Sequence, residues 1–274
     1  MLPMKLLDWI DKSKLDWPNL SANPNAIMIL KENIEKLNWS MLSSNPAAIE
    51  LLKENPEKIN WAMLSKNSEA IEILKEIPHK IYWPYLSYNL NPEIITILKE
   101  NLTKIEWISL STNPNAIELL KNYPKKINWD TLSKNPNAIK LLKENPHKIY
   151  WSYLSANPQA IKLLKENPEK IDWDQLALNE NAIQLLKENP EKINWALLSF
   201  NKNALELFKK NPHKIFWPYL SSNPGIFTYD YEKMRNSNLD LKEEIIAKAL
   251  HPKRIFRLIE EYGEDEIYDI YFDE

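Results

Sequence analysis

The sequence of 274 residues contains no cysteine. Disulfides, cysteine-ligated zinc and thiol catalysis are therefore excluded, and an intracellular protein is favoured. The chain also lacks an apolar run of 18 residues, and its first residues do not combine a basic segment with a long apolar stretch. We therefore expect a soluble, unprocessed protein that is neither secreted nor membrane-spanning and has no membrane partner.

Neither sign of charge dominates the composition. The chain has 35 basic and 38 acidic residues, for a net charge of -3. No global field therefore draws it to DNA or to an anionic membrane, although local stripes of charge remain possible. Arginine is scarce, because Arg235, Arg254 and Arg257 are the only three.

Tryptophan recurs with a fixed spacing through most of the chain. Ten tryptophans are separated by 22 residues, except for one interval of 24 residues: Trp17, Trp39, Trp61, Trp83, Trp107, Trp129, Trp151, Trp173, Trp195 and Trp217. A period of this length is typical of a solenoid, in which each unit buries its apolar face only by stacking on its neighbours. Function is then expected on surfaces rather than in a pocket.

The unit at residues 135–156, NPNAIKLLKENPHKIYWSYLSA, shows why each repeat should be helical. Asn135 and Pro136 suit the N-cap and the first helical position, and the apolar residues that follow form one face. Asn145 and Pro146 end this helix, and asparagine there tolerates a left-handed backbone, although other units have Ile77 or Tyr123 instead. The second half predicts a turn into a short α or 3-10 helix.

A leucine-rich-repeat horseshoe is the alternative fold, because asparagine ladders also occur there. Such a repeat needs a strand position that always faces inward. The residue after each tryptophan varies too much for that role, including Ser40, Pro84, Ile108 and Asp130. The pattern therefore favours an all-α, right-handed solenoid of about nine 22-residue repeats, each with one α-helix and a short α or 3-10 helix.

The asparagine that opens each unit persists where the next proline is lost, as at Asn67, Asn179 and Asn201. Serine or aspartate would cap a helix about as well. We therefore predict a buried asparagine ladder that joins successive units.

The repeats divide the chain into three segments. Residues 1–22 form an N-terminal half-repeat cap, 23–222 the nine tandem repeats, and 223–274 a helical C-terminal cap with an acidic tail. The two-residue insertion is placed at 89–90, before a unit that opens at Asn91, and we expect a local bulge there. In the C-terminal cap, helices are expected near 240–250 and 252–262, the second ended by Gly263. Nine units that each advance about 10 Å predict a curved body roughly 90 Å long.

The tandem phrases NPNAI, LLKENP, KINW and LS resemble the short Trp and Asn-Pro repeat proteins of nucleocytoplasmic large DNA viruses, the giant viruses. The resemblance covers residues 5–222 and extends to TYDYEKMR and LKEEIIAKALHPKRIFRLIEE near the carboxyl end. More distantly, the chain is similar to leucine-rich-variant solenoids of α and 3-10 helices. The resemblance implies an α-solenoid without an established activity, located in the host cytoplasm or the virion.

Two lysine ladders run through the units. One is at the end of the first helix and is followed by glutamates. The other precedes each tryptophan by three residues and supplies the candidate phosphate contacts Lys36, Lys58, Lys80, Lys104, Lys126, Lys148, Lys170, Lys192 and Lys214. The alternative is that each of these lysine stems covers the indole three residues later, with its ammonium over the ring.

Every third unit carries a histidine and a pair of aromatic residues. His79, His147 and His213 lie too far apart along a stack of helical units to share a metal ion. The aromatic pairs are the candidate partner contacts, with core packing as the alternative: Tyr82 and Tyr85, Tyr150 and Tyr153, Phe216 and Tyr219.

The resulting hypothesis is a non-enzymatic protein–protein interaction scaffold of a large DNA virus, bound to a viral or host protein. The alternatives are a nucleic-acid-binding solenoid that uses the lysine ladders and a structural component of the virion. A recurring serine has no matching histidine and carboxylate, so no catalytic residue is assigned, and no metal or cofactor is expected.

Overall fold

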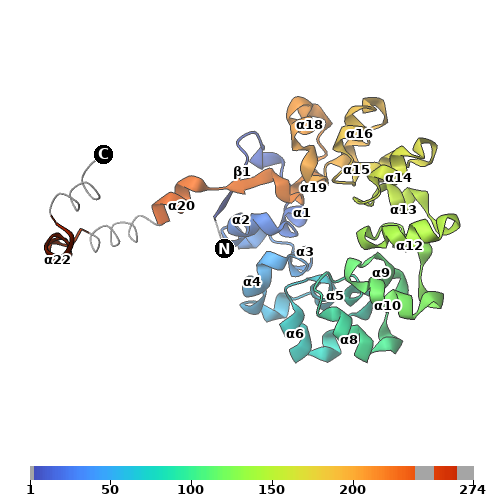
Figure 1. Ribbon diagram of the computed structural model, residues 1–274, viewed down its shortest axis with the longest axis horizontal. Helices are drawn as coiled ribbons and strands as arrows, with labels where there is room; N and C mark the ends of the chain where they lie inside the picture. Colours follow the sequence, from blue (N-terminus) through green and yellow to red (C-terminus); the bar gives the residue numbers. More distant parts are fainter. Residues whose placement is uncertain (1–2, 238–249, 264–274) are drawn as a thin grey trace. The chain divides into compact units, whose positions relative to one another are not determined.

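The computed structural model describes residues 3–237 and 250–263. These fall into two compact units, Leu6–Thr228 and a smaller one made of residues 3–5 with 229–237 and 250–263. The larger unit is an all-α solenoid of repeated α and 3-10 helices, as the sequence predicts. Within it the α-helices form two concentric layers (Figure 1).

The inner layer contains the helices that begin at the repeated tryptophans (Figure 1). They are α1 (Trp17–Ser21), α3 (Trp39–Ser43), α5 (Trp61–Lys66), α7 (Trp83–Leu86), α9 (Trp107–Thr112), α11 (Trp129–Leu132), α13 (Trp151–Ser155), α15 (Trp173–Ala177), α17 (Trp195–Leu198) and α19 (Trp217–Ser221). The outer layer is α2 (Ile27–Lys31), α4 (Ile49–Lys53), α6 (Ile71–Glu76), α8 (Ile94–Glu100), α10 (Ile117–Asn122), α12 (Ile139–Glu144), α14 (Ile161–Lys165), α16 (Ile183–Lys187) and α18 (Leu205–Lys210).

Short 3-10 helices lie in the connections between the layers. Those entering the outer helices are η2 (Pro24–Ala26), η4 (Pro46–Ala48), η8 (Pro114–Ala116), η10 (Pro136–Ala138) and η14 (Lys202–Ala204), and the corresponding η16 (Pro224–Ile226) leads to a strand. Those leading to the inner helices are η1 (Lys12–Lys14), η3 (Ile34–Lys36), η5 (Pro56–Lys58), η6 (Pro78–Lys80), η7 (Leu102–Lys104), η9 (Pro124–Lys126), η11 (Pro146–Lys148), η12 (Pro168–Lys170), η13 (Pro190–Lys192) and η15 (Pro212–Lys214).

The core lies between the two helical layers. Leu154 of an inner helix and Leu142 of an outer helix are completely buried, as are their counterparts in the other units. With only four to seven residues, these helices are too short to be stable alone, so packing between layers and between units holds them.

The predicted asparagine ladder is present and buried. The Oδ1 atom of Asn157 accepts a hydrogen bond from the Gln159 N–H in the turn before α14, and the same bond from Asn135 to Asn137 caps η10 in the preceding unit. The Nδ2 group of Asn157 donates to the carbonyls of Ser133 (3.0 Å) and Asn135 (2.8 Å) in the preceding unit. Serine or aspartate could cap the helix but could not donate these two bonds. The ladder comprises Asn23, Asn45, Asn67, Asn89, Asn113, Asn135, Asn157, Asn179, Asn201 and Asn223.

The fourth of these ladder positions corrects the register expected from the sequence. Asn89, rather than Asn91, donates to the carbonyls of Ser65 and Asn67. Asn91 instead donates to the Ser68 carbonyl, the bond that asparagines two residues past the ladder make in other units. The two extra residues therefore follow Asn91, just before α8, rather than at 89–90.

The asparagine that ends each outer helix has a backbone different from the expected one. Asn145 has φ -133° and ψ 59°, and no residue other than glycine has a positive φ in the part of the chain that the structure describes. Its Nδ2 donates to the Leu141 carbonyl at 3.0 Å. The side chain thus caps the helix C-terminus directly, without a left-handed turn.

The solenoid closes on itself. Asn23 of the first full unit donates to the carbonyls of Ser221 (3.0 Å) and Asn223 (2.9 Å), at the opposite end of the repeats. The Asp16 N–H donates to Ser221 Oγ at 2.8 Å, and α1 packs against α19 as well as against α3. These are the contacts that join consecutive units elsewhere, so the repeats form a ring of ten units (Figure 1). The expected open body about 90 Å long is wrong.

Both ends of the repeat region build the tenth unit together. Asn223 and η16 begin it, and η1 and α1, from the start of the chain, complete it. Where the outer helix would be, β1 (Met4–Leu6) pairs with β2 (Phe227–Tyr229), and the Leu7 N–H donates to the Ile226 carbonyl. The segments expected as an N-terminal cap and the start of a C-terminal cap thus bind neighbouring units instead of covering free ends.

The smaller unit contains α20 (Tyr231–Ser237) and α22 (Pro252–Tyr262). The helix expected at 252–262 is confirmed, with Pro252 in its first turn and Gly263 after it at φ 97°. The helix expected near 240–250 falls mostly, and the acidic tail entirely, outside the described residues.

Replacing the ladder amide should be far more costly than replacing the other asparagine of a unit. In Asn157→Asp the cap acceptor is retained, but two buried carbonyls lose their donor, so we expect a loss of at least about 2 kcal/mol. Asn167→Asp loses one bond, to Leu163, at a half-buried site and should cost roughly 1 kcal/mol. Urea unfolding monitored by circular dichroism compares the two, and equal midpoints would contradict the ladder's role.

Ring closure can be tested with the same substitution at the seam. In a closed ring, Asn23→Asp should destabilise the protein about as much as Asn157→Asp, because both amides donate to a preceding unit. In an open solenoid Asn23 would have no preceding unit, and the substitution would leave the urea midpoint nearly unchanged. A midpoint close to that of the unsubstituted protein would therefore reject closure.

Candidate interaction surfaces

The lysines three residues before each tryptophan lie over indole rings, but not over the expected ones. Lys148 Nζ is 4.3 Å from the ring centroid of Trp129, in the preceding unit, rather than over Trp151. Each such contact therefore joins two units. Eight are present, with Lys14 on Trp217 across the seam and with Lys36, Lys58, Lys80, Lys104, Lys148, Lys170 and Lys192 on the tryptophan of the preceding unit.

Two units lack the lysine–tryptophan contact and carry an aromatic contact instead. The Tyr123 ring packs on Trp107 with centroids 5.3 Å apart, where Lys126 would otherwise lie. Phe208 lies 6.0 Å from Trp195, the ring that Lys214 would cover. Trp107 and Trp195 thus keep a neighbouring side chain on the indole when the lysine is elsewhere.

The lysines at the ends of the outer helices are in part neutralised by carboxylates. Lys53, Lys75 and Lys121 form ion pairs with the glutamate three residues earlier, at 2.7 to 3.0 Å. Lys75 also reaches Glu93 at 2.7 Å, and its hydrogen bonds to Glu72 and Glu93 raise the pKa of its ammonium. Three lysines of this ladder thus have carboxylate partners, whereas in the other ladder only Lys14 pairs with a carboxylate among the described residues.

The aromatic pairs proposed as partner contacts lie at the starts of α7, α13 and α19, in the inner layer. Tyr82, Tyr150 and Phe216 are 47%, 45% and 42% exposed. Each forms an edge-to-face pair with the aromatic residue three positions later, at centroid distances of 5.0, 5.0 and 4.6 Å. They are surface clusters rather than part of the core.

These exposed aromatic residues replace helix caps. The residue before tryptophan is an N-cap, and in other units its side chain accepts a backbone hydrogen bond, as Asn128 does from Thr131. Tyr82, Tyr150 and Phe216 make no such bond. Losing an N-cap costs about 1 kcal/mol. Three units therefore have an exposed ring where an asparagine would stabilise the helix.

Phe200 extends the third aromatic pair. Its ring stacks on Tyr219 with centroids 4.2 Å apart and is 39% exposed. The sequence gives no sign of this contact, because Phe200 lies in the preceding unit and outside the repeated aromatic positions. Packing of neighbouring inner helices brings the two rings together.

The recurring serines are structural. Ser155 Oγ donates to the Trp151 carbonyl and accepts from the Asp172 N–H of the next unit, so it links neighbouring inner helices. Fully buried, it is not available as a nucleophile. No group of three or more histidine, aspartate or glutamate residues is placed to hold a metal ion in the described ranges. Likewise, none of the helices described there is long and apolar enough to cross a membrane.

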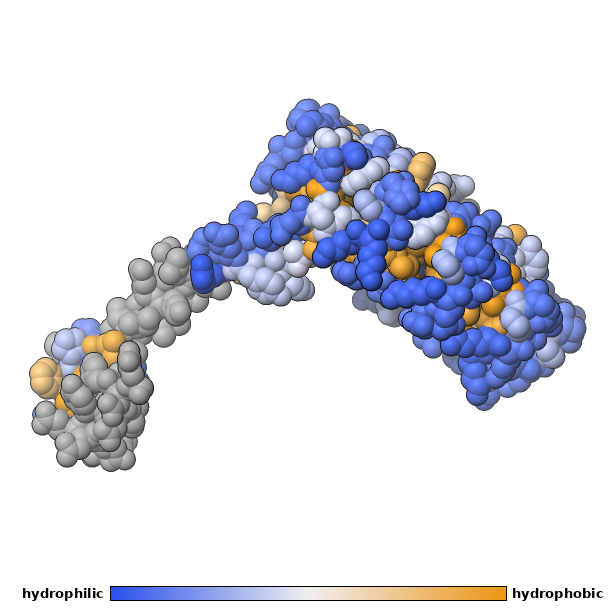
Figure 2. Space-filling model, turned by 90° about the horizontal axis from the view of Figure 1, so that it is seen from above, coloured by the Kyte–Doolittle hydropathy of each residue, from blue (hydrophilic) through white to orange (hydrophobic). Residues whose placement is uncertain are grey.

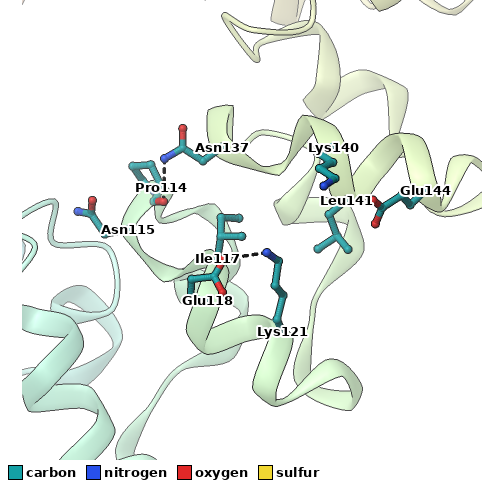
Figure 3. Close-up of a pocket in the computed structure, with 9 residues that line it drawn as sticks. All are labelled: Pro114, Asn115, Ile117, Glu118, Lys121, Asn137, Lys140, Leu141 and Glu144. Carbon is teal, nitrogen blue, oxygen red and sulfur yellow. Dashed lines mark hydrogen bonds and ion pairs between the residues drawn. The ribbon is translucent and has the colours of Figure 1, made fainter.

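The outer surface over the repeats is largely hydrophilic, with strips of hydrophobic residues between (Figure 2). One groove lies between α10 and α12 (Figure 3). Ile117 and Leu141 line it, but Lys121 is paired there with Glu118, and the Asn137 amide donates to the Pro114 carbonyl. The groove contains no polar group whose arrangement points to a particular ligand.

Comparison with protein-family models, with curated proteins and with solved structures found no match to this chain.

Ala177 takes the place of the serine in one unit, and restoring the serine should stabilise the ring. In Ala177→Ser the new hydroxyl can donate to the Trp173 carbonyl and accept from the Asn194 N–H, as Ser155 does with Trp151 and Asp172. We expect a gain of about 0.5–1.5 kcal/mol. Ser133→Ala, which removes the same pair of bonds, is the matched reverse change. A lower urea midpoint for Ala177→Ser would contradict this account.

Proposed function

We propose that this chain is a non-enzymatic protein–protein interaction scaffold of a large DNA virus, and that its protein partner contacts the three aromatic pairs on the inner helices. The observation that carries the proposal is the replacement of three stabilising caps by exposed rings. Local stability favours asparagine at this position, so the rings are better explained by binding.

The physical chemistry of the pairs suits a protein partner. Tyrosine and phenylalanine offer a large apolar area with few rotatable bonds, and aromatic residues are enriched among interface residues that dominate binding energy. Tyr85 and Tyr219 are half-buried and Tyr153 is 37% exposed, and each holds the more exposed ring beside it. This support reduces the ordering cost when a partner binds.

The proposed viral origin rests on the sequence resemblance. The same resemblance also fits a structural component of the virion, which is the alternative function. Abundance distinguishes the two roles. A structural component should be present in purified particles in large, fixed amounts relative to capsid protein, as measured by quantitative mass spectrometry. A scaffold for a transient partner should be sparse there and abundant in infected cells.

The repeat itself supplies a substitution that tests the contacts without harming the fold. The triple variant has Asn in place of Tyr82, Tyr150 and Phe216. Asparagine is the cap found at this position in four other units, Asn38, Asn60, Asn128 and Asn194, so the variant should fold with a full set of caps. The unsubstituted protein and the triple variant are each purified by affinity from infected cells, and the bound proteins are compared by quantitative mass spectrometry. Proteins that bind specifically to the unsubstituted protein should be lost from the triple variant.

The matched control is Tyr88→Asn, which removes an exposed ring outside the three pairs and should retain every partner. Circular dichroism and urea unfolding verify that all variants are folded. An unchanged set of partners in the triple variant would reject the aromatic pairs as the contact surface.

A further inference from the structure

The ten lysines three residues before each tryptophan, here named the lysine crown, lie on one face of the ring. They are Lys14, Lys36, Lys58, Lys80, Lys104, Lys126, Lys148, Lys170, Lys192 and Lys214. Each ends a 3-10 helix that leads from the outer to the inner layer, whereas the asparagine-ladder turns lead from inner to outer. The two sets of connections therefore lie on opposite faces of the ring.

Charge is segregated onto the face that carries the crown. The residues eight to three positions before the ten tryptophans include 22 lysines and 12 carboxylates, whereas the rest of Leu6–Thr228 has 5 lysines and 13 carboxylates. The small net charge of the whole chain conceals this separation. A face with a large excess of cations attracts polyanions even when the protein as a whole does not.

The crown lysines are available to bind an anion. Only Lys14 has a carboxylate within ion-pair distance, Asp11 at 3.8 Å, among the described residues. In eight units the ammonium is held 4.3 to 5.9 Å from an indole centroid, a contact that orients the side chain without neutralising its charge. Seven crown lysines are thus positioned on an indole with no carboxylate at ion-pair distance among the described residues: Lys36, Lys58, Lys80, Lys104, Lys148, Lys170 and Lys192.

The closed circular arrangement distinguishes among polyanions. Double-stranded DNA has a persistence length of about 150 base pairs, so it touches a small ring only along a short chord. A single strand is flexible enough to pass from one crown lysine to the next around the circle, and such proteins combine a basic track with nearby aromatic rings. The half-buried tryptophans beneath the lysines provide those rings.

We infer that the lysine crown binds single-stranded nucleic acid through its sugar–phosphate backbone, without base specificity. This binding does not depend on the aromatic pairs proposed as protein contacts. The affinity should fall steeply with salt, because each phosphate neutralised on a single strand contributes about -0.7 to the slope of log K against log salt.

The test measures fluorescence anisotropy of labelled single-stranded oligonucleotides, a 20-residue oligo(dT) and an oligo(U), between 50 and 200 mM salt. In Lys148→Gln/Lys170→Gln/Lys192→Gln, three contacts are lost, so the salt slope should become shallower by about 2. The control, Lys53→Gln/Lys75→Gln/Lys121→Gln, removes three ion-paired lysines and the same total charge and should retain the slope.

Further arms separate this inference from its competitors. The variant with Tyr82, Tyr150 and Phe216 changed to Asn should bind the oligonucleotides normally, whether or not it has lost protein partners. Vesicles of phosphatidylcholine with phosphatidylserine, and a 20-base-pair duplex, should bind more weakly than the single strand. Absent or salt-insensitive oligonucleotide binding, equal slopes for the two lysine variants, or a preference for vesicles or duplex would overturn the inference.

Discussion

The side-chain amide of the ladder asparagine is the group on which the ring depends. At Asn157 it accepts from a backbone N–H of the turn that leads to its own outer helix and donates to two carbonyls of the preceding unit, so one residue shapes its own turn and binds the neighbouring unit. It does so without burying a charge, which would be costly. No buried side-chain polar atom lacks a hydrogen-bond partner in the part of the chain described. The position therefore requires asparagine for the two hydrogen bonds that its amide group donates as much as for the one that its oxygen accepts.

Closure extends this interaction to the ends of the repeat array. An open solenoid leaves one set of carbonyls and one apolar surface exposed at each end, and capping segments must cover them. Here the carbonyls of Ser221 and Asn223 receive the amide of Asn23, so the first and last units cover each other. The cost is the loop entropy of joining residues about 200 positions apart, which grows only slowly with loop length.

The sequence predicts the helices within one unit and the residue type that each position requires. It does not predict how neighbouring units are oriented, which decides closure of the ring and the contacts between units. The ladder was predicted because asparagine persists after proline is lost, as at Asn179. Ring closure was missed because it depends on small angles between units that add up over the array, and no residue type encodes them. The register error at Asn91 arose because Asn-Pro marks the ladder elsewhere, although Asn89 makes the bonds. The sequence predicts Lys148 over Trp151, three residues later, but packing between units places it over Trp129.

Closure of the ring also changes the surroundings of the exposed aromatic residues. Each exposed aromatic residue before a tryptophan is followed, one unit on, by a carboxylate cap: Glu106 follows Tyr82, Asp172 follows Tyr150, and across the seam Asp16 follows Phe216. The third instance exists only in the ring. The carboxylate caps, the exposed aromatic residues and the crown lysines all lie where the chain enters an inner helix, with Tyr82 two residues after Lys80, so the aromatic surface and its acidic neighbours adjoin the basic one. A polyanion on the crown and a protein on the aromatic pairs would then be selected by local charges of opposite sign on adjoining surfaces.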